Sequence, residues 1–305
     1  MHSGREKMKT LCFGSLNIDN VYHVPHFVAR GETLAASELN VFSGGKGLNQ
    51  SIALSRAGLE VFHAGAIGED GRFLLEELKS SGVDTRYTAV LDGIKTGHAI
   101  IQKGADGDNC ILLYGGANQQ ITREQIDETL ENFGEGDLLV VQNEISELHY
   151  LVNKAKERKM LAALNPSPME MSLLPLLSRV DYLILNEIEA SQFLGLPEPG
   201  YPDTMLDDLI RRFPAVTIAL TLGKYGSIYA SGNERIRQSA IPVQAVDTTA
   251  AGDTFTGFLL AGLFINKDPK WAMEYAARAA AIAVTRLGAA PSIPSRDEVA
   301  VGDRI

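Results

Sequence analysis

Short apolar runs alternate with amphipathic stretches along most of the chain. Strand-like apolar runs occupy residues 9–16, 61–67, 137–142, 160–165, 181–186 and 215–222. Apolar residues recur at helical spacing in residues 47–57, 73–80, 123–133, 147–159, 187–194, 204–212, 252–264 and 269–287. Because strands that alternate with helices favour a sheet covered on both faces, the pattern predicts an α/β fold with a mostly parallel sheet.

Two segments interrupt this alternation. Residues 18–42 contain two extended stretches around Pro25 and Gly31, and residues 97–114 contain a hairpin pattern with its turn at residues 104–109. Neither segment contains a crossover helix, so we expect a small antiparallel sheet that stands off the main domain as a lid. The alternative interpretation is a pair of edge hairpins without a function. The division that follows assigns residues 17–42 and 96–118 to the lid, and residues 8–16, 43–95 and 119–305 to the core.

Charge and composition narrow the classes of function. The 305 residues include 38 acidic and 28 basic side chains, for a formal net charge of -10. This balance disfavours nucleic acid or an anionic membrane as a partner. The longest obvious apolar run, residues 257–265, is too short to span a membrane and is a candidate core helix.

The ends of the chain and its cysteines indicate a compartment. Only two cysteines occur, Cys12 and Cys110, which form neither a disulfide framework nor a zinc cluster and favour a reducing cytoplasm. The first ten residues are too polar for a secretory signal. Met8 is a candidate native start, which makes residues 1–7 a candidate cloning remnant.

The first chemical motif is Ser-Gly-Gly-Lys-Gly-Leu-Asn-Gln at residues 43–50, where a helix is predicted to begin. Glycines let the backbone approach a ligand closely, and the free amides at a helix start suit oxygens and anions. The motif is not a Walker A loop, because Gly47 follows Lys46 where that loop requires Ser or Thr. A plain tight turn is the alternative interpretation.

The second motif covers residues 245–257 and reads Ala-Val-Asp-Thr-Thr-Ala-Ala-Gly-Asp-Thr-Phe-Thr-Gly. Its small residues expose consecutive N–H groups at a helix start, which predicts an anion hole. Phosphate would repel Asp253 at the mouth of that hole, unless this carboxylate takes a proton from an attacking hydroxyl. The alternative is that Asp253 only caps its helix.

These two motifs resemble the signature stretches of the ribokinase, or PfkB-type, family of sugar kinases, and the glycine-rich form resembles its ribokinase branch. The resemblance covers residues 11–294 in order and spacing. It continues in residues 14–19 (GSLNID), 31–33 (GET), 186–189 (NEIE), 221–226 (TLGKYG), 283–289 (AVTRLGA) and 291–292 (PS). It implies a ribokinase-like three-layer sandwich with a small β-sheet lid.

The resemblance also implies a role for each matched residue. Asp253 would be the catalytic base, and the anion hole would consist of Ala250, Ala251 and Gly252. The residues expected to bind the sugar are Asn17, Asp19, Gly45, Lys46, Gly47, Asn49, Glu144 and Asp253. Buried carboxylates and amides suit a polyol, because charge-assisted hydrogen bonds to hydroxyls are strong. For Glu144 the alternative is a solvent-facing strand end.

The nucleotide and its ions have their own matched positions. Asn186 and Glu189 would serve the magnesium and phosphate end of ATP, with Glu189 acting through water; the alternative is a helix cap with an acidic first turn. The residues expected to line the nucleotide are Thr221, Leu222, Gly223, Lys224, Tyr225, Gly226, Gly252 and Ala277. The resemblance places a potassium ion, partly through carbonyl oxygens, at Asp247, Thr249, Ala283, Arg286, Gly288 and Ser292; for the last four the alternative is an ordinary helix end.

Several positions depart from the family pattern. These are Leu48, His98, Gln102, Lys103, Phe258 and Ala277, and Ala277 replaces a His or Asn that often lies near adenine. His98 is interpreted as a lid or dimer residue rather than a catalyst. None of them alters the base or the anion hole, so they bear mainly on the identity of the sugar.

The function that follows is ATP-dependent phosphorylation of a sugar, with the 5-hydroxyl of D-ribose as the leading acceptor and Mg²⁺ and K⁺ as ions. One alternative is another sugar acceptor, such as deoxyribose or a fructose- or tagatose-like ketohexose, or a nucleoside. A different class is a sugar-binding regulator without turnover, which the intact base and anion hole argue against. The lid is expected to join two subunits into a homodimer, with Ile100, Ile111 and Leu113 as an apolar face.

Overall fold

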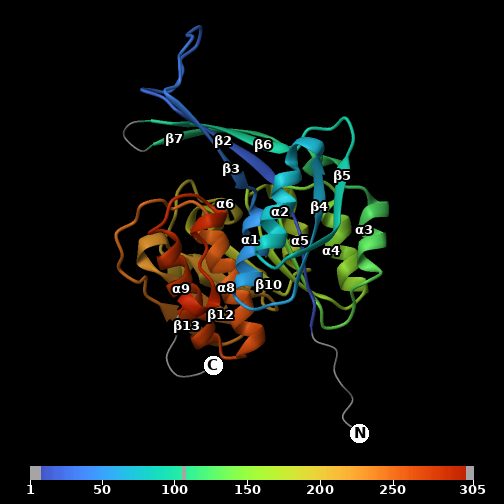
Figure 1. The fold of residues 1–305 in the computed structure, drawn as a ribbon. Helices are drawn as coiled ribbons and strands as arrows, with labels where there is room; N and C mark the ends of the chain where they lie inside the picture. Colours follow the sequence, from blue (N-terminus) through green and yellow to red (C-terminus); the bar gives the residue numbers. More distant parts are fainter. Residues whose placement is uncertain (1–7, 105–107, 300–305) are drawn as a thin grey trace.

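A computed structural model describes residues 8–104 and 108–299, and within them nine strands form one large sheet (Figure 1). The strand order is β13-β12-β11-β10-β9-β8-β1-β4-β5. Their bounds are β1 Thr10–Phe13, β4 Val61–Gly68, β5 Asp84–Leu91, β8 Leu138–Gln142, β9 Leu161–Asn165, β10 Tyr182–Asn186, β11 Thr217–Thr221, β12 Ser227–Ser231 and β13 Glu234–Gln238. All neighbours pair in parallel except β11–β12 and β12–β13.

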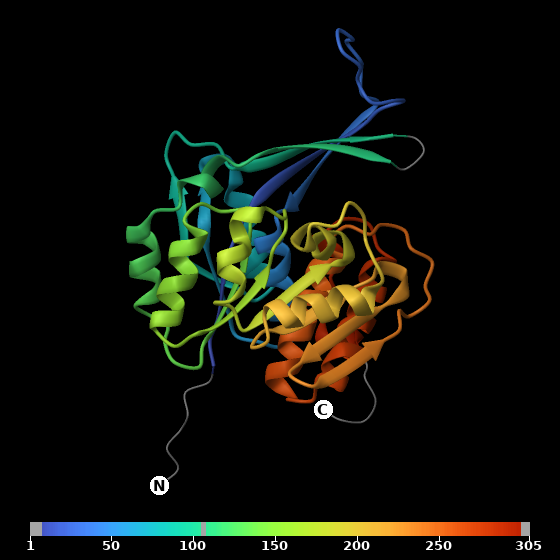
Figure 2. The same ribbon diagram turned by 180° about the vertical axis from the view of Figure 1, so that it is seen from behind.

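Helices cover both faces of this sheet (Figures 1 and 2). One face carries α1 Lys46–Arg56, α2 Arg72–Ser80, α8 Ala251–Ile265 and α9 Pro269–Ala283. The other carries α3 Arg123–Leu130, α4 Leu148–Glu157, α5 Leu174–Leu177, α6 Glu187–Leu194 and α7 Pro202–Arg212. Because successive side chains of a strand point to opposite faces, Leu11 and Phe13 enter one core and Cys12 enters the other.

The order in which strands are added to the sheet reverses at β1, and this reversal places the site. From β1 the sheet extends through β4 and β5 on one side, and through β8 to β13 on the other. In open α/β sheets ligands bind beyond the carboxyl ends of the strands at such a switch point. The loops after β1, β8, β9 and β10 are therefore brought together at one edge.

A second sheet of four strands stands off the core, which confirms the predicted fold class (Figure 2). It has the order β3-β2-β6-β7, with β2 Asn17–His23, β3 Glu38–Gly44, β6 Gly97–Lys103 and β7 Asn109–Tyr114. The expectation that it is antiparallel is wrong for one pair, because β2 and β6 run parallel. No hairpin joins these two strands, and the chain passes through β4, α2 and β5 between them.

The register of the second sheet corrects the predicted apolar face. Ile111 pairs with Ile101, and Leu113 pairs with Ala99, so these residues share one face. Ile100 pairs with Leu112 and points to the opposite face. Both faces expose large apolar side chains, because Ile111 is 52% exposed and Leu112 is 67% exposed.

The remaining differences from the sequence-based elements are local. The helix predicted at residues 269–287 ends at Ala283, and Gly288 follows with a φ of 84°. Three strands, β5, β12 and β13, were not predicted. Residues 1–7 and part of the predicted turn at residues 104–109 lie outside the described residues. Within residues 8–104 and 108–299, none of the helices has the length and apolar character needed to cross a membrane.

Candidate active site

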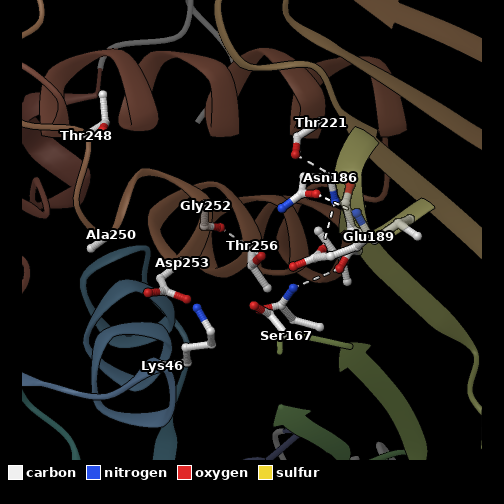
Figure 3. Close-up of a pocket in the computed structure, with 13 residues that line it drawn as sticks. Lys46, Ser167, Asn186, Glu189, Thr221, Thr248, Ala250, Gly252, Asp253 and Thr256 are labelled. Carbon is white, nitrogen blue, oxygen red and sulfur yellow. Dashed lines mark hydrogen bonds between the residues drawn. The ribbon is translucent and has the colours of Figure 1, made fainter. Parts of the chain in front are cut away.

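A cavity of about 230 Å³ lies at the carboxyl edge of the large sheet (Figure 3). Strand ends β9, β10 and β11 supply one wall, and the first turns of α1 and α8 supply the other. The lining residues are Lys46, Asn165, Ser167, Ile184, Leu185, Asn186, Glu189, Thr221, Thr248, Ala250, Gly252, Asp253 and Thr256. The structure thus brings residues of both signature motifs to one cavity with the predicted nucleotide residues Asn186, Glu189 and Thr221.

The anion hole was predicted at the start of α8. Ala250 is the N-cap and adopts a left-handed conformation with φ 59°, which turns the chain sharply into the helix. The first intrahelical bond of this turn runs from Thr254 N to Ala250 O, at 2.8 Å. The amides of Gly252 and Asp253 precede that bond at the positive end of the helix dipole, and the amide of Ala251 donates to Thr248 O at 3.3 Å. Gly252 is exposed and leaves the approach to these amides open.

Two amide side chains from α1 hold the carboxylate of Asp253. Asn49 Nδ2 donates to Oδ2 at 3.1 Å, and Gln50 Nε2 donates to Oδ1 at 2.9 Å. Asp253 is only 8% exposed, so these bonds replace water that the carboxylate has lost. Asn49 Oδ1 has no partner within residues 8–104 and 108–299, although it is buried. That orphaned acceptor suits a hydroxyl donor from a ligand.

The glycine-rich loop holds α1 against the end of β1. Gly45 is the N-cap with φ 95°, and a Cβ at Gly47 would collide with the backbone of Gly14 and Ser15. Glu144, beyond β8, accepts from Ser15 Oγ and from Lys46 N, the latter at 3.2 Å. Glu144 therefore does not lie at a solvent-facing strand end, because it ties three segments of the chain together.

Lys46 is the cation of the site. Burial lowers its pKa, but the carboxylates of Asp253, Glu144, Glu189 and Asp19 outweigh burial and raise it. Lys46 therefore keeps its charge at neutral pH. Figure 3 shows its ammonium group on the same side of the cavity as the Asp253 carboxylate.

Asp19 and Asn17 of β2 lie against the glycine-rich loop, beside Gly44 and Gly45, and outside the cavity lining. Burial, followed by repulsion from Glu144, raises the pKa of Asp19 from 3.8 to about 7. Asn17 is buried, and its Oδ1 accepts from Asn118 Nδ2 at 2.8 Å. Burial also raises the pKa of Glu144, so the two carboxyl groups share an environment that resists a second negative charge.

Asn186 and Glu189 form a capping box at the start of α6. Asn186 Oδ1 accepts from Glu189 N at 2.8 Å, and Glu189 Oε2 accepts from Asn186 N at 2.9 Å. The cap that was weighed as an alternative is therefore present, yet both residues also line the cavity. Capping uses Oε2 of Glu189, and its carboxylate remains a member of the cavity wall.

The predicted nucleotide segment forms a turn after β11. Thr221 ends the strand in the cavity wall, and residues 223–225 form a short 3₁₀ turn. Gly226 closes it with φ 103°, where a Cβ would strike the carbonyl of Gln238. Tyr225 is 71% exposed. Leu222 to Gly226 and the half-buried Ala277 of α9 lie outside the cavity lining.

The predicted potassium residues gather in two adjoining segments. The Asp247 carboxylate accepts from Thr249 N at 2.9 Å, Thr249 Oγ1 at 2.6 Å and Gly288 N at 3.1 Å. Val246 N donates to Val284 O at 2.7 Å, which joins the same two segments. Arg286 directs its guanidinium to Glu298, and Ser292 is fully buried.

Sequence reasoning missed several residues of the site. Asn165 at the end of β9 and Ser167 beyond it line the cavity, and Gln50 contacts Asp253 from α1. A signal was available for Asn165 and Ser167, because polar residues at the end of a buried parallel strand meet at the ligand edge. Asn118 carried no such signal, because its contact with Asn17 spans 101 positions of sequence.

The residues that depart from the family pattern do not line the cavity. Leu48 and Phe258 are fully buried, and Phe258 packs edge-on against Tyr275 with ring centroids 4.9 Å apart. His98 belongs to the second sheet, where its ring lies 5.0 Å from that of Tyr114.

This fold and site define a class of enzyme. A buried carboxylate beside a helix N-terminus, facing a cavity with a lysine, suits transfer of a phosphoryl group to a hydroxyl. The model of the pfkB family of carbohydrate kinases matches residues 7–296 of the chain. The chain therefore belongs to the PfkB carbohydrate kinase family, as the motifs indicated, and is an ATP:sugar phosphotransferase.

Individual relatives agree with this assignment. The ribokinase of Staphylococcus aureus is 34% identical over 300 residues, which cover 95% of this chain and 98% of the relative. The crystal structure of ribokinase from Thermotoga maritima has a TM-score of 0.85 at 33% identity and covers 96% of this chain and 98% of its own. Arabidopsis thaliana ribokinase complexed with ribose and ATP has a TM-score of 0.85 at 28% identity, covering 96% and 97%.

The raised pKa of Asp19 predicts how stability changes with pH. Its folded-state pKa is about 7 and its ordinary value is 3.8, so the folded protein binds this proton more tightly than the unfolded chain. Stability should therefore fall as pH rises between these values, and remain lower above pH 7. Asp19→Asn cannot ionise, so it should gain stability relative to the wild type between pH 4 and pH 8. Urea unfolding across this range measures the difference, with the exposed Asp92→Asn as control. Parallel profiles for all three proteins would contradict the prediction.

Proposed function

We propose that the sugar is D-ribose and that the enzyme phosphorylates its 5-hydroxyl. The observation that carries this is the buried Asp253, held by Asn49 and Gln50 at the start of α8. Relatives that share a third of the sequence over nearly the whole chain are ribokinases, and one related structure holds ribose with ATP. Asp253 supports transfer to a hydroxyl, and the relatives support ribose over a ketohexose or a nucleoside.

Asp253 takes the proton of the attacking hydroxyl as that oxygen forms its bond to the γ-phosphorus of ATP. The bond from phosphorus to the leaving oxygen of ADP breaks in line. Negative charge on the transferred group develops in front of the amides of Ala251 and Gly252, where the positive end of α8 stabilises it. Lys46 contributes a fixed positive charge on the same wall.

The sugar lies between the second sheet and the glycine-rich loop. Its hydroxyls exchange hydrogen bonds with five side chains, those of Asn17, Asp19, Lys46, Asn49 and Glu144. The backbone of Gly45 and Gly47 lies against the sugar. Support comes from Asn49 Oδ1, which has no partner among the described residues, and from Asp19 and Glu144, whose pKa values are raised by burial. A polyol that replaces lost water would relieve the cost of this burial.

ATP extends from the anion hole along the turn of residues 221–226 to Ala277. Glu189 fits magnesium through water, because one buried carboxylate is too few for a dehydrated ion. Magnesium would neutralise phosphate charge.

Segments 246–249 and 283–292 fit a monovalent cation, because hydrogen bonds around Asp247 hold the two segments and their backbone carbonyls together. Potassium there would fix the loop that leads into α8.

A panel of acceptors tests the substrate. ADP release should be fastest with D-ribose, compared with 2-deoxyribose, fructose and adenosine.

Asp253→Asn should retain binding of ribose and ATP but lose about 10²- to 10⁴-fold in kcat, because a general base is removed. Calorimetry and the same ADP assay measure the two properties. A preference for adenosine would overturn the substrate, and wild-type kcat in the variant would overturn the base.

Potassium should activate more than sodium. The motivation is the joined pair of segments that contains Asp247, Thr249, Ala283, Arg286, Gly288 and Ser292. Initial rates at fixed ionic strength in potassium, sodium and tetramethylammonium chloride measure the effect. Equal rates in all three salts would remove the cation site from the proposal.

The second sheet, residues 17–42 and 96–118, is proposed to act as both a lid and a dimer contact upon the core of residues 8–16, 43–95 and 119–305. Its strands β3 and β7 are edges, and both carry exposed apolar side chains, including Val41 at 53% and Leu113 at 56%. Such edges usually need a partner.

The buried Cys12 and the exposed Cys110 are free thiols, which supports a reducing cytoplasm as the compartment.

Charged residues on the second sheet should separate the subunits. The double change Ile111→Asp and Leu113→Asp places two carboxylates on one face, and should both weaken the dimer and raise KM for the sugar. Met171→Asp, exposed at 56% outside this sheet, is the matched control. Sedimentation at micromolar concentration with parallel kinetics measures both. A monomeric wild type with full ribose kinase activity would refute the dimer contact and leave the catalytic roles standing.

A further inference from the structure

A chain of buried amide side chains runs beneath the active site and ends on Asp253. Gln142 of β8 donates through Nε2 to Gln50 Oε1 at 2.7 Å. Gln50 Nε2 donates both to Asp253 Oδ1 at 2.9 Å and to Asn165 Oδ1 at 3.0 Å. Asn165 Nδ2 donates to the backbone carbonyl of Ile184 at 3.0 Å. Side chains from β8, α1, β9 and α8 are thus linked in one network.

The backbone fixes the direction of every bond in this network. The carbonyl of Ile184 can only accept, so Asn165 must present Nδ2 to it and Oδ1 to Gln50. Gln50 must then present Nε2 to Asn165 and Oε1 to Gln142. A flipped Gln50 amide would set its oxygen against two acceptors, Asn165 Oδ1 and the Asp253 carboxylate. The bond from Asn165 to the carbonyl of Ile184 therefore determines that Gln50 presents its Nε2 donor, and not its oxygen, to Asp253.

Gln50 differs from Asn49 in what its amide can do once a sugar arrives. In the part of the chain that the structure describes, Asn49 Oδ1 has no partner, so its amide group can serve a hydroxyl as well as Asp253. Both polar atoms of Gln50 are already bonded within the protein, and Gln50 is fully buried. Gln50 is thus the contact of Asp253 that stays unchanged as substrate binds.

We propose that Gln50 is a positioning residue for phosphoryl transfer: it holds Asp253 Oδ1 so that the carboxylate keeps one orientation toward the acceptor hydroxyl. The role rests on the proposed function of Asp253 as the base. It predicts an effect on turnover rather than on binding, because the sugar-binding groups of Asp19, Lys46 and Glu144 do not involve Gln50.

The first test is Gln50→Met, which keeps the length and bulk of the side chain and removes the amide. We expect kcat to fall by about 10- to 100-fold, since small misplacements of a reacting group have effects of this size. KM for ribose and for ATP should stay within about two-fold. Gln125→Met is the matched control, because Gln125 Nε2 also bonds the sheet, at the carbonyl of Gly65, but from α3. Its kcat should match the wild type.

A double-mutant cycle separates positioning from general loss of structure. In an Asp253→Asn background there is no base to orient, so Gln50→Met should cost little further kcat. An equal loss in both backgrounds, a loss confined to KM, or an unchanged kcat in the single variant would each overturn the proposal. If Asp253→Asn itself keeps wild-type kcat, the assignment of the base fails instead, and the two failures are distinguishable.

A second variant decides the matter if Gln50→Met does not fold. Gln142→Met removes the donor to Gln50 Oε1, and Gln142 Oε1 has no partner among the described residues, so the change also removes a buried orphan acceptor. The network predicts a smaller fall in kcat that again disappears in the Asp253→Asn background. Wild-type kcat in Gln142→Met would overturn the proposal in that case.

Discussion

The contact between α1 and α8 is the constraint on which the site depends. A Cβ at Gly257 of α8 would collide with Ala53 of α1, so the two helices approach more closely than side chains of ordinary size permit. At this separation, amide groups from the first turns of α1 reach a carboxylate in the first turn of α8. The same proximity leaves two positive helix ends directed at one cavity. A wider spacing would leave Asp253 buried without donors, which is a costly arrangement for a charged group.

One lysine faces four carboxyl groups in the site. Lys46 lies among Asp19, Glu144, Glu189 and Asp253, and its raised pKa reflects all four. One cation does not neutralise four carboxylates. Burial, followed by repulsion from Glu144, raises the pKa of Asp19 to about 7, and burial raises the pKa of Glu144. The excess of acid suits sugar hydroxyls, which donate hydrogen bonds, and it opposes a polyphosphate. In the proposed mechanism, cations that accompany the nucleotide, together with the amides of α8, would offset this negative charge.

Sequence patterns predicted the parts of the fold that are buried on both faces, and the parts of the site that lie within one loop. Strands such as β8 and β10 are continuous apolar runs, and the turn at Gly44–Gly47 has a glycine signal of its own. By contrast, β13 carries exposed charges at Glu234 and Arg235, so its residues resemble a loop. The parallel pairing of β2 with β6 joins strands about 80 positions apart and has no local signature. The network of Gln50, Gln142 and Asn165 is invisible for the same reason, because no pattern of single residues reports a contact 92 or 115 positions away.

One turn of α1 connects the two proposed halves of the reaction. At its first residues, Lys46 N donates to Glu144 and Gly47 N donates to Ser15 Oγ, which fixes the loop proposed to face the sugar. Three and four positions after Lys46, Asn49 and Gln50 donate to the Asp253 carboxylate on α8. A single helical turn therefore sets the distance between the proposed sugar-binding groups and the proposed base. Asn186 and Glu189, proposed to serve the nucleotide, lie instead at the start of α6, with their own capping box. In the proposed mechanism, α1 thus places acceptor and base together, and α6 places the phosphoryl donor independently.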